Sequence, residues 1–76
     1  MPPVDKSWDG FRVGVVHSAW FVHRAYGEDT LAEELLLELG VPIVSLRRLA
    51  AREMFAFRRG FWSSLERRRA INRGLK

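Results

Sequence analysis

A chain of 76 residues without cysteine has to hold its fold together by packing alone. A domain of this length buries only about 60% of the surface that its unfolded chain exposes, so its stability is marginal. Disulfides are excluded, and two histidines are too few for a structural zinc site. Because hydrophobic residues make up 47% of the chain, with five Phe and three Trp, we expect one compact domain over residues 1–76 rather than disorder.

The N-terminal third gives a mixed pattern. Residues 1–10 are expected to form an irregular lead-in, since Pro2 and Pro3 oppose a helix and Asp9-Gly10 is typical of a turn. From about Val13 to Tyr26 the apolar residues recur at helical spacing, which favours a helix. Residues 11–16 and 41–46 are also rich in β-branched residues, so two strands of a small α+β fold remain the alternative.

Residues 30–39 show the clearest helical pattern. Leu31, Leu35 and Leu39 fall on one stripe. Thr30 and Glu33 have the spacing of a capping box, in which each side chain bonds the other residue's backbone N–H. Gly40 is expected to end this helix, because glycine adopts the left-handed conformation without strain.

The apolar residues after Pro42 step by three or four up to about Arg73, which predicts either one helix of about 30 residues or a bend at Gly60. We expect a bend or fray at Gly60, followed by a C-terminal helix that begins near Phe61 and ends before Gly74. The expected fold is therefore an all-α domain of three to four helices, with a long basic C-terminal helix.

Charge is distributed unevenly along the chain. Residues 1–43 contain three basic and seven acidic side chains, whereas residues 44–76 contain ten basic and two acidic ones. This asymmetry predicts a basic surface that meets nucleic acid, an acidic protein, or the acidic half of the same chain.

A possible DNA-binding unit lies in residues 32–51. Apolar residues and a glycine stand at the spacings of two short helices joined by a tight turn: Leu35, Leu39, Gly40, Val41, Leu46 and Leu49. In this respect the segment resembles the helix-turn-helix family of DNA-binding proteins, although Leu36 stands where that family places a small residue. The resemblance implies that the segment from Val44 onward is a recognition helix in the major groove. The alternative is an antiparallel helical hairpin.

Several polar residues follow this turn. On the helix-turn-helix hypothesis, Ser45, Arg47 and Arg48 contact base edges. The remaining candidates for phosphate contact are Arg52, Arg58, Arg59, Arg67, Arg68 and Arg69. The function predicted from these residues is a small regulator of transcription that binds duplex DNA. The competing interpretation is a solvated helix face that Glu33, Glu34 and Glu38 partly neutralise.

A different function is favoured by the aromatic residues. Phe55 and Trp62 are seven residues apart, as anchors on one helix face would be, so the alternative is a bacterial or phage adaptor or inhibitor that binds an acidic or grooved protein partner. If a second aromatic stripe stays uncovered, a homodimer would hide it.

The sequence favours neither catalysis nor a cofactor. His17 and Ser18 are sequence neighbours and do not constitute a nucleophile and base, and His23 is not at a metal-binding distance from His17. We expect no enzyme, no metal and no cofactor. No apolar run is long enough for a membrane span, and the acidic, Pro-rich start differs from a signal peptide, so we expect a cytoplasmic protein that does not enter membranes.

Overall fold

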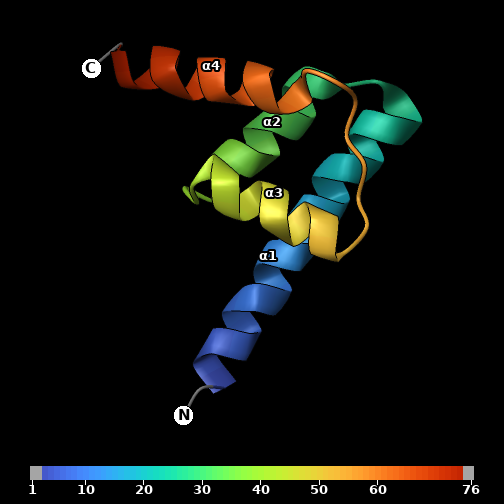
Figure 1. Cartoon of the computed structure of the whole chain (residues 1–76), viewed down its shortest axis with the longest axis vertical. Coiled ribbons are helices and arrows are strands. Elements are labelled where there is room, and N and C mark those ends of the chain that lie inside the picture. Colours follow the sequence, from blue (N-terminus) through green and yellow to red (C-terminus); the bar gives the residue numbers. More distant parts are fainter. Residues whose placement is uncertain (1–2, 75–76) are drawn as a thin grey trace.

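The computed structural model describes residues 3–74, and its side chains are described from Asp9 onward. The elements are α1 (Pro3–Phe21), the π-helical turn η1 (Val22–Tyr26), α2 (Asp29–Leu37), α3 (Ile43–Arg52) and α4 (Phe61–Gly74) (Figure 1). The predicted all-α domain of three to four helices is confirmed. No strand occurs in residues 3–74, so the alternative of strands at 11–16 and 41–46 is wrong.

Helix α1 begins ten residues earlier than expected. It starts at Pro3, so the prediction of an irregular lead-in over residues 1–10 is wrong from residue 3 onward, and residues 1 and 2 lie outside the described part. Proline is tolerated at the first helical position, because a backbone N–H there has no partner within the helix. Gly10, expected to mark a turn, is accommodated inside the helix at a cost of about 1 kcal/mol.

Helix α2 starts without the predicted capping box. Its N-cap is Glu28, which makes no side-chain cap bond, and Thr30 lies inside the first turn. The carboxylate of Glu33 bonds Arg68 instead of the helix start, so tertiary contacts override this local pattern. The predicted stop is confirmed: α2 ends at Leu37, and Gly40 has φ +64° in the turn that follows.

The C-terminal helix predicted to begin near Phe61 is confirmed as α4, but the helical pattern before it does not continue as helix up to Gly60. Helix α3 ends at Arg52, and residues 53–60, which we call the basic loop, separate it from α4. The chain turns sharply at Met54, whose φ is +66°, and the backbone N–H of Phe55 donates a 2.8 Å hydrogen bond to the carbonyl of Ala50. The interruption therefore takes up eight residues rather than a bend at Gly60.

The core lies where four helices meet. Helices α2 and α3 each pack against both α1 and α4, and the molecule is flat, with extents of 38 × 32 × 16 Å (Figure 1). The core consists of Val16, Ala19, Ala32, Leu36, Val41, Ile43, Leu46, Ala50, Phe61 and Leu65. Leu36, Leu46 and Leu65 are fully buried, so α2, α3 and α4 each contribute one leucine to its centre.

Candidate nucleic-acid interface

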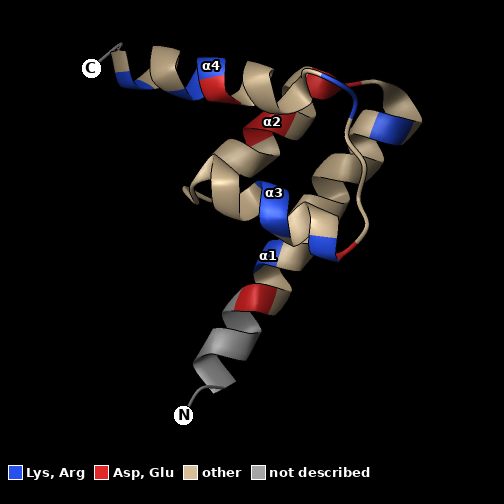
Figure 2. Ribbon diagram, in the orientation of Figure 1, with Lys and Arg blue, Asp and Glu red and all other residues tan. Residues whose placement is uncertain are grey.

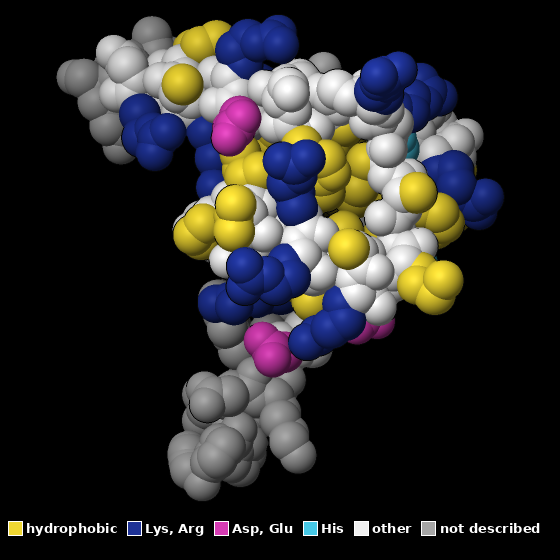
Figure 3. Space-filling model, viewed as in Figure 1, with side chains coloured by type: hydrophobic (Ala, Val, Ile, Leu, Met, Phe, Trp, Pro, Cys, Tyr) yellow, Lys and Arg dark blue, Asp and Glu magenta, His cyan; other side chains and the backbone are white. Residues whose placement is uncertain are grey.

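Arginine side chains are concentrated on three segments in the second half of the chain. The ribbon view places basic residues on α3, on the basic loop and on α4 (Figure 2). The space-filling view shows their side chains over these three segments, around a hollow where hydrophobic side chains are visible (Figure 3). We use the name arginine face for the arginines of these three segments other than Arg68: Arg47, Arg48, Arg52, Arg58, Arg59, Arg67, Arg69 and Arg73. Arg67 and Arg69, two residues apart on α4, project to different sides of that helix. All except Arg69 are exposed.

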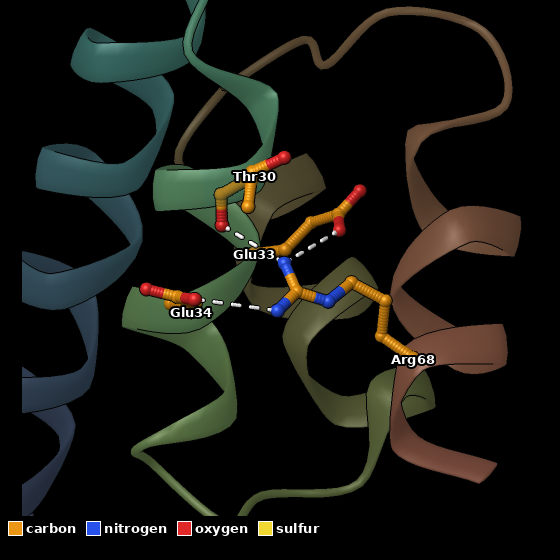
Figure 4. A network of polar contacts seen from close by, with 4 residues as sticks. All are labelled: Thr30, Glu33, Glu34 and Arg68. Carbon is orange, nitrogen blue, oxygen red and sulfur yellow. Dashed lines mark hydrogen bonds and ion pairs between the residues drawn. The ribbon is translucent and has the colours of Figure 1, made fainter. Parts of the chain in front are cut away.

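Arg68, one of the arginines predicted to contact phosphate, forms ion pairs with two glutamates of the same chain. The Arg68 guanidinium lies 3.3 Å from a carboxylate oxygen of Glu33 and 3.3 Å from one of Glu34, and it also donates to the carbonyl of Thr30 at 3.2 Å (Figure 4). Glu33 is only 4% exposed, so the pair neutralises a buried charge and joins α4 to α2. Arg68 therefore stabilises the contact between α4 and α2, and we do not count it as part of the arginine face.

Among the described side chains, no acidic residue of positions 9–43 forms an ion pair with a member of the arginine face. Arg52 makes an exposed contact of 3.4 Å with Glu53, a type of pair that contributes little to stability in water. Within the described residues, no ion pair is made by Arg47, Arg48, Arg58, Arg59, Arg67, Arg69 or Arg73. The expected compensation by Glu33, Glu34 and Glu38 is thus limited to Arg68.

Arg69 is the most constrained member of the arginine face. Its Nη2 atom is buried and has no hydrogen-bond partner among the described residues. Burial, and secondly the positive charge of Arg73, lower the pKa of the Arg69 guanidinium from its ordinary value. Arginine nevertheless stays charged at neutral pH, so an anion that approached Arg69 and Arg73 would relieve both the repulsion and the missing hydrogen bond.

The basic loop is attached to α1 through an aromatic cluster. The indole N–H of Trp20 donates a 3.0 Å hydrogen bond to the carbonyl of Ala56. The ring of Phe55 stacks on Trp20 with centroids 5.4 Å apart, and Arg24 covers the Trp20 ring at 4.6 Å. These contacts position the part of the loop that precedes Arg58.

His23 is the residue that fixes the backbone of Arg58, a role that the sequence does not predict. Its ring is 2% exposed, the backbone N–H of Arg58 donates to Nε2 at 2.9 Å, and Nδ1 lies 2.7 Å from the carboxylate of Asp29. Because Nε2 accepts a hydrogen bond, Nδ1 carries the proton and donates to Asp29. His23 follows Val16 and Ala19 at helical spacing, and this position on the apolar face is the only signal in the sequence.

The segment with the helix-turn-helix pattern forms two helices, α2 and α3, joined by a turn. Ile43 is buried in the core, whereas Val44, Arg47 and Arg48 are exposed along α3, and Ser45 is half-buried toward α1. The exposed residues of α3 therefore include Arg47 and Arg48, the two arginines predicted to contact base edges.

The two proposed partner anchors do not share a helix face. Phe55 lies in the basic loop and Trp62 in α4, so their spacing of seven residues has no helical meaning. Both are half-buried and pack against the core, and Trp62 contacts the rings of Phe57 and Phe61. The prediction of an anchor pair on one helix is wrong because the chain leaves the helix at Arg52.

No side-chain cluster in residues 9–74 brings together three or more His, Asp or Glu in a way that could hold a metal ion. In the described part of the chain, no helix combines the length and the apolar character needed to cross a membrane. Comparisons with protein-family models, curated proteins and solved structures gave no match.

Proposed function

We propose that this protein is a regulator that binds duplex DNA through the arginine face. The observation that supports the proposal best is that α3, the basic loop and α4 all carry exposed arginines, and that among the described residues Arg52 is the only one of these exposed arginines in an ion pair, an exposed contact with Glu53 (Figure 3). A surface of this kind attracts the phosphate backbone by neutralising its charge and releasing counterions, whatever the base sequence.

Within this face, α3 is the element that enters the major groove. It is ten residues long, about 15 Å, and Arg47 projects from its exposed side. Arg58 and Arg59 on the basic loop and Arg67 on α4 contact the flanking phosphates, at positions that His23 and the Arg68 bridge hold in place. The groove contacts select sequence and the phosphate contacts supply most of the affinity.

The alternative function, an adaptor or inhibitor anchored by Phe55 and Trp62, has less support because both rings pack against the chain's own core. The same packing removes the uncovered aromatic stripe that suggested a homodimer. Homodimerisation stays a prediction, and light scattering coupled to size-exclusion chromatography measures it directly.

The proposal is tested by fluorescence anisotropy with a mixed-sequence duplex, starting at about 50 mM salt, where electrostatic binding is strong. The three phosphate contacts of Arg58, Arg59 and Arg67 predict a slope of about −3 for log K against log salt. No binding at this salt concentration would refute the proposal.

Two neighbouring arginines provide a matched comparison. Arg67→Gln removes an exposed, unpaired charge and should make the salt slope about one unit shallower. Arg68→Gln removes the same charge from a side chain that already pairs with Glu33 and Glu34, so it should leave the slope unchanged at a temperature where circular dichroism shows both variants folded. Equal effects of the two substitutions would contradict the assignment of Arg67 as a phosphate contact.

A further inference from the structure

The ring of His23 connects three segments that are distant from one another in the sequence. Its Nδ1 atom lies 2.7 Å from the carboxylate of Asp29 at the start of α2, and its Nε2 atom accepts the backbone N–H of Arg58 at 2.9 Å. The same ring contacts the rings of Phe57 and Phe61, with centroids 5.2 Å apart in both pairs. Because the His23 side chain is 2% exposed, its two nitrogens depend on Asp29 and Arg58 for their hydrogen bonds.

Only the neutral ring can make both of these bonds. A neutral imidazole donates through one nitrogen and accepts through the other, whereas a protonated imidazole donates through both. The Arg58 N–H is a donor in either state, so a second proton on His23 would place two N–H donors against each other and break this bond. The bond to Asp29 keeps its direction and becomes an ion pair.

The charge of a protonated His23 would be balanced by Asp29, whose carboxylate is its ion-pair partner among the described residues. On α1, the nearest titratable group in sequence is His17, whose ring contacts Trp20 and Phe55. Helix α4 meets the His23 ring with Phe61, and α3 does not pack against η1. The charged side chains of η1, of the residue before α2 and of the basic loop are exposed: Arg24, Glu28, Glu53, Arg58 and Arg59.

Residues 57–60 are the part of the basic loop that the bond to His23 holds. Before them, the carbonyl of Ala56 is fixed by the indole N–H of Trp20 at 3.0 Å. After them, α4 begins with the buried Phe61, whose backbone N–H donates to the carbonyl of Arg58. Within the described residues, the bond to Nε2 is the one hydrogen bond that joins residues 57–60 to η1, so its loss frees this short segment while both of its ends stay attached.

We propose that His23 is a pH-dependent switch for the basic loop. Uptake of a second proton breaks the bond to Arg58 and releases residues 57–60, which carry Arg58 and Arg59, while the ring stays paired with Asp29. Histidine side chains change their charge between about pH 5 and 8, a range in which aspartate side chains are ordinarily charged. The segment is therefore held at the upper end of this range and released at the lower end.

An NMR titration of the full chain from about pH 8 to about pH 5 tests the switch without any ligand. The signals of the ring nitrogens report the protonation of His23, and the amide proton signal of Arg58 reports the hydrogen bond. We expect the two to change with a common midpoint, the Arg58 amide proton moving upfield as its bond is lost. A ring that stays neutral throughout, or an Arg58 signal that does not move when the ring takes up its proton, would overturn the proposal.

Two variants assign the effect to one histidine. His23→Gln offers Arg58 an amide oxygen that accepts a hydrogen bond and has no charge at any pH, so the pH dependence of the Arg58 signal should disappear. His17→Phe is the matched control, because His17 also titrates and contacts Phe55 in the same loop; it should leave the Arg58 titration unchanged. The reverse pattern would assign the effect to His17 and overturn the switch. So would a loss of helical circular dichroism by the parent near pH 5, which would show global rather than local opening.

Duplex binding at the two ends of the pH range connects the switch to the proposed function, on which this last step rests. At constant salt we expect the parent to bind more weakly at the lower pH, because Arg58 and Arg59 are no longer held in place, and His23→Gln to bind equally at both. If Arg58 titrates with His23 but no duplex binds at either pH, the switch stands and the proposed function is wrong. If a duplex binds and Arg58 does not titrate, DNA binding stands and the switch is wrong.

Discussion

The bond between His23 and the backbone of Arg58 provides the sharpest test of how the arginine face is positioned. Replacing His23 by Phe keeps an aromatic ring of similar shape against Phe57 and Phe61 but removes both ring nitrogens. The Arg58 N–H then loses its acceptor at 2.9 Å, and Asp29 loses a donor at 2.7 Å.

The expected change in the free energy of unfolding follows from the loss of these two hydrogen bonds. A buried N–H without a partner costs about 1–3 kcal/mol, and a hydrogen bond to a carboxylate contributes about 1.5–3 kcal/mol. Asp29 is 43% exposed on its side chain and regains water, which reduces the second term. We therefore expect His23→Phe to lower the free energy of unfolding by about 2–4 kcal/mol, out of roughly 4–11 kcal/mol for a domain of this length.

Urea denaturation followed by circular dichroism measures this change, and hydrogen exchange at the Arg58 amide reports on the bond itself. His17→Phe is the control, because His17 is exposed and its ring packs against the rings of Trp20 and Phe55, contacts that a phenyl ring can keep. We expect the control to change stability by less than about 0.5 kcal/mol. A His23→Phe variant within 1 kcal/mol of the parent, with unchanged exchange at Arg58, would refute the reasoning.

Three further substitutions test the fold around the site. Arg68→Gln leaves the buried Glu33 without its ion pair, and because Arg68 is 30% exposed we expect a loss of about 1–2 kcal/mol in urea denaturation, recovered in part by the additional change Glu33→Gln. Gly40→Ala places a Cβ on a residue with φ +64°, and thermal unfolding should show a loss of about 1–2 kcal/mol. Leu36→Ala empties a fully buried position, so unfolding in urea should show a loss of about 2–5 kcal/mol; a smaller loss would mean that α2 and α3 close the cavity.

Local sequence patterns predicted the helical elements well where one segment carried the whole signal. The leucine stripe of residues 31–39 predicted α2, and Gly40 predicted where it ends. Both signals are local, because the helical repeat and the left-handed conformation of a glycine depend on residues close in the sequence. The uneven charge distribution also predicted a basic surface. The charge distribution does not show that Arg68 pairs with Glu33 and Glu34, which are more than 30 residues away in the sequence.

The sequence by itself determined an all-α domain, the stop at Gly40 and the concentration of arginines after Val44. Only the tertiary structure decided that helix α3 ends at Arg52 and that a loop separates it from α4. Residues 53–60 carry a helical pattern, yet Trp20 and His23 bond the backbone of Ala56 and Arg58 across 36 and 35 residues. These two hydrogen bonds hold the loop against α1 and η1, and helical spacing contains no record of such distant contacts.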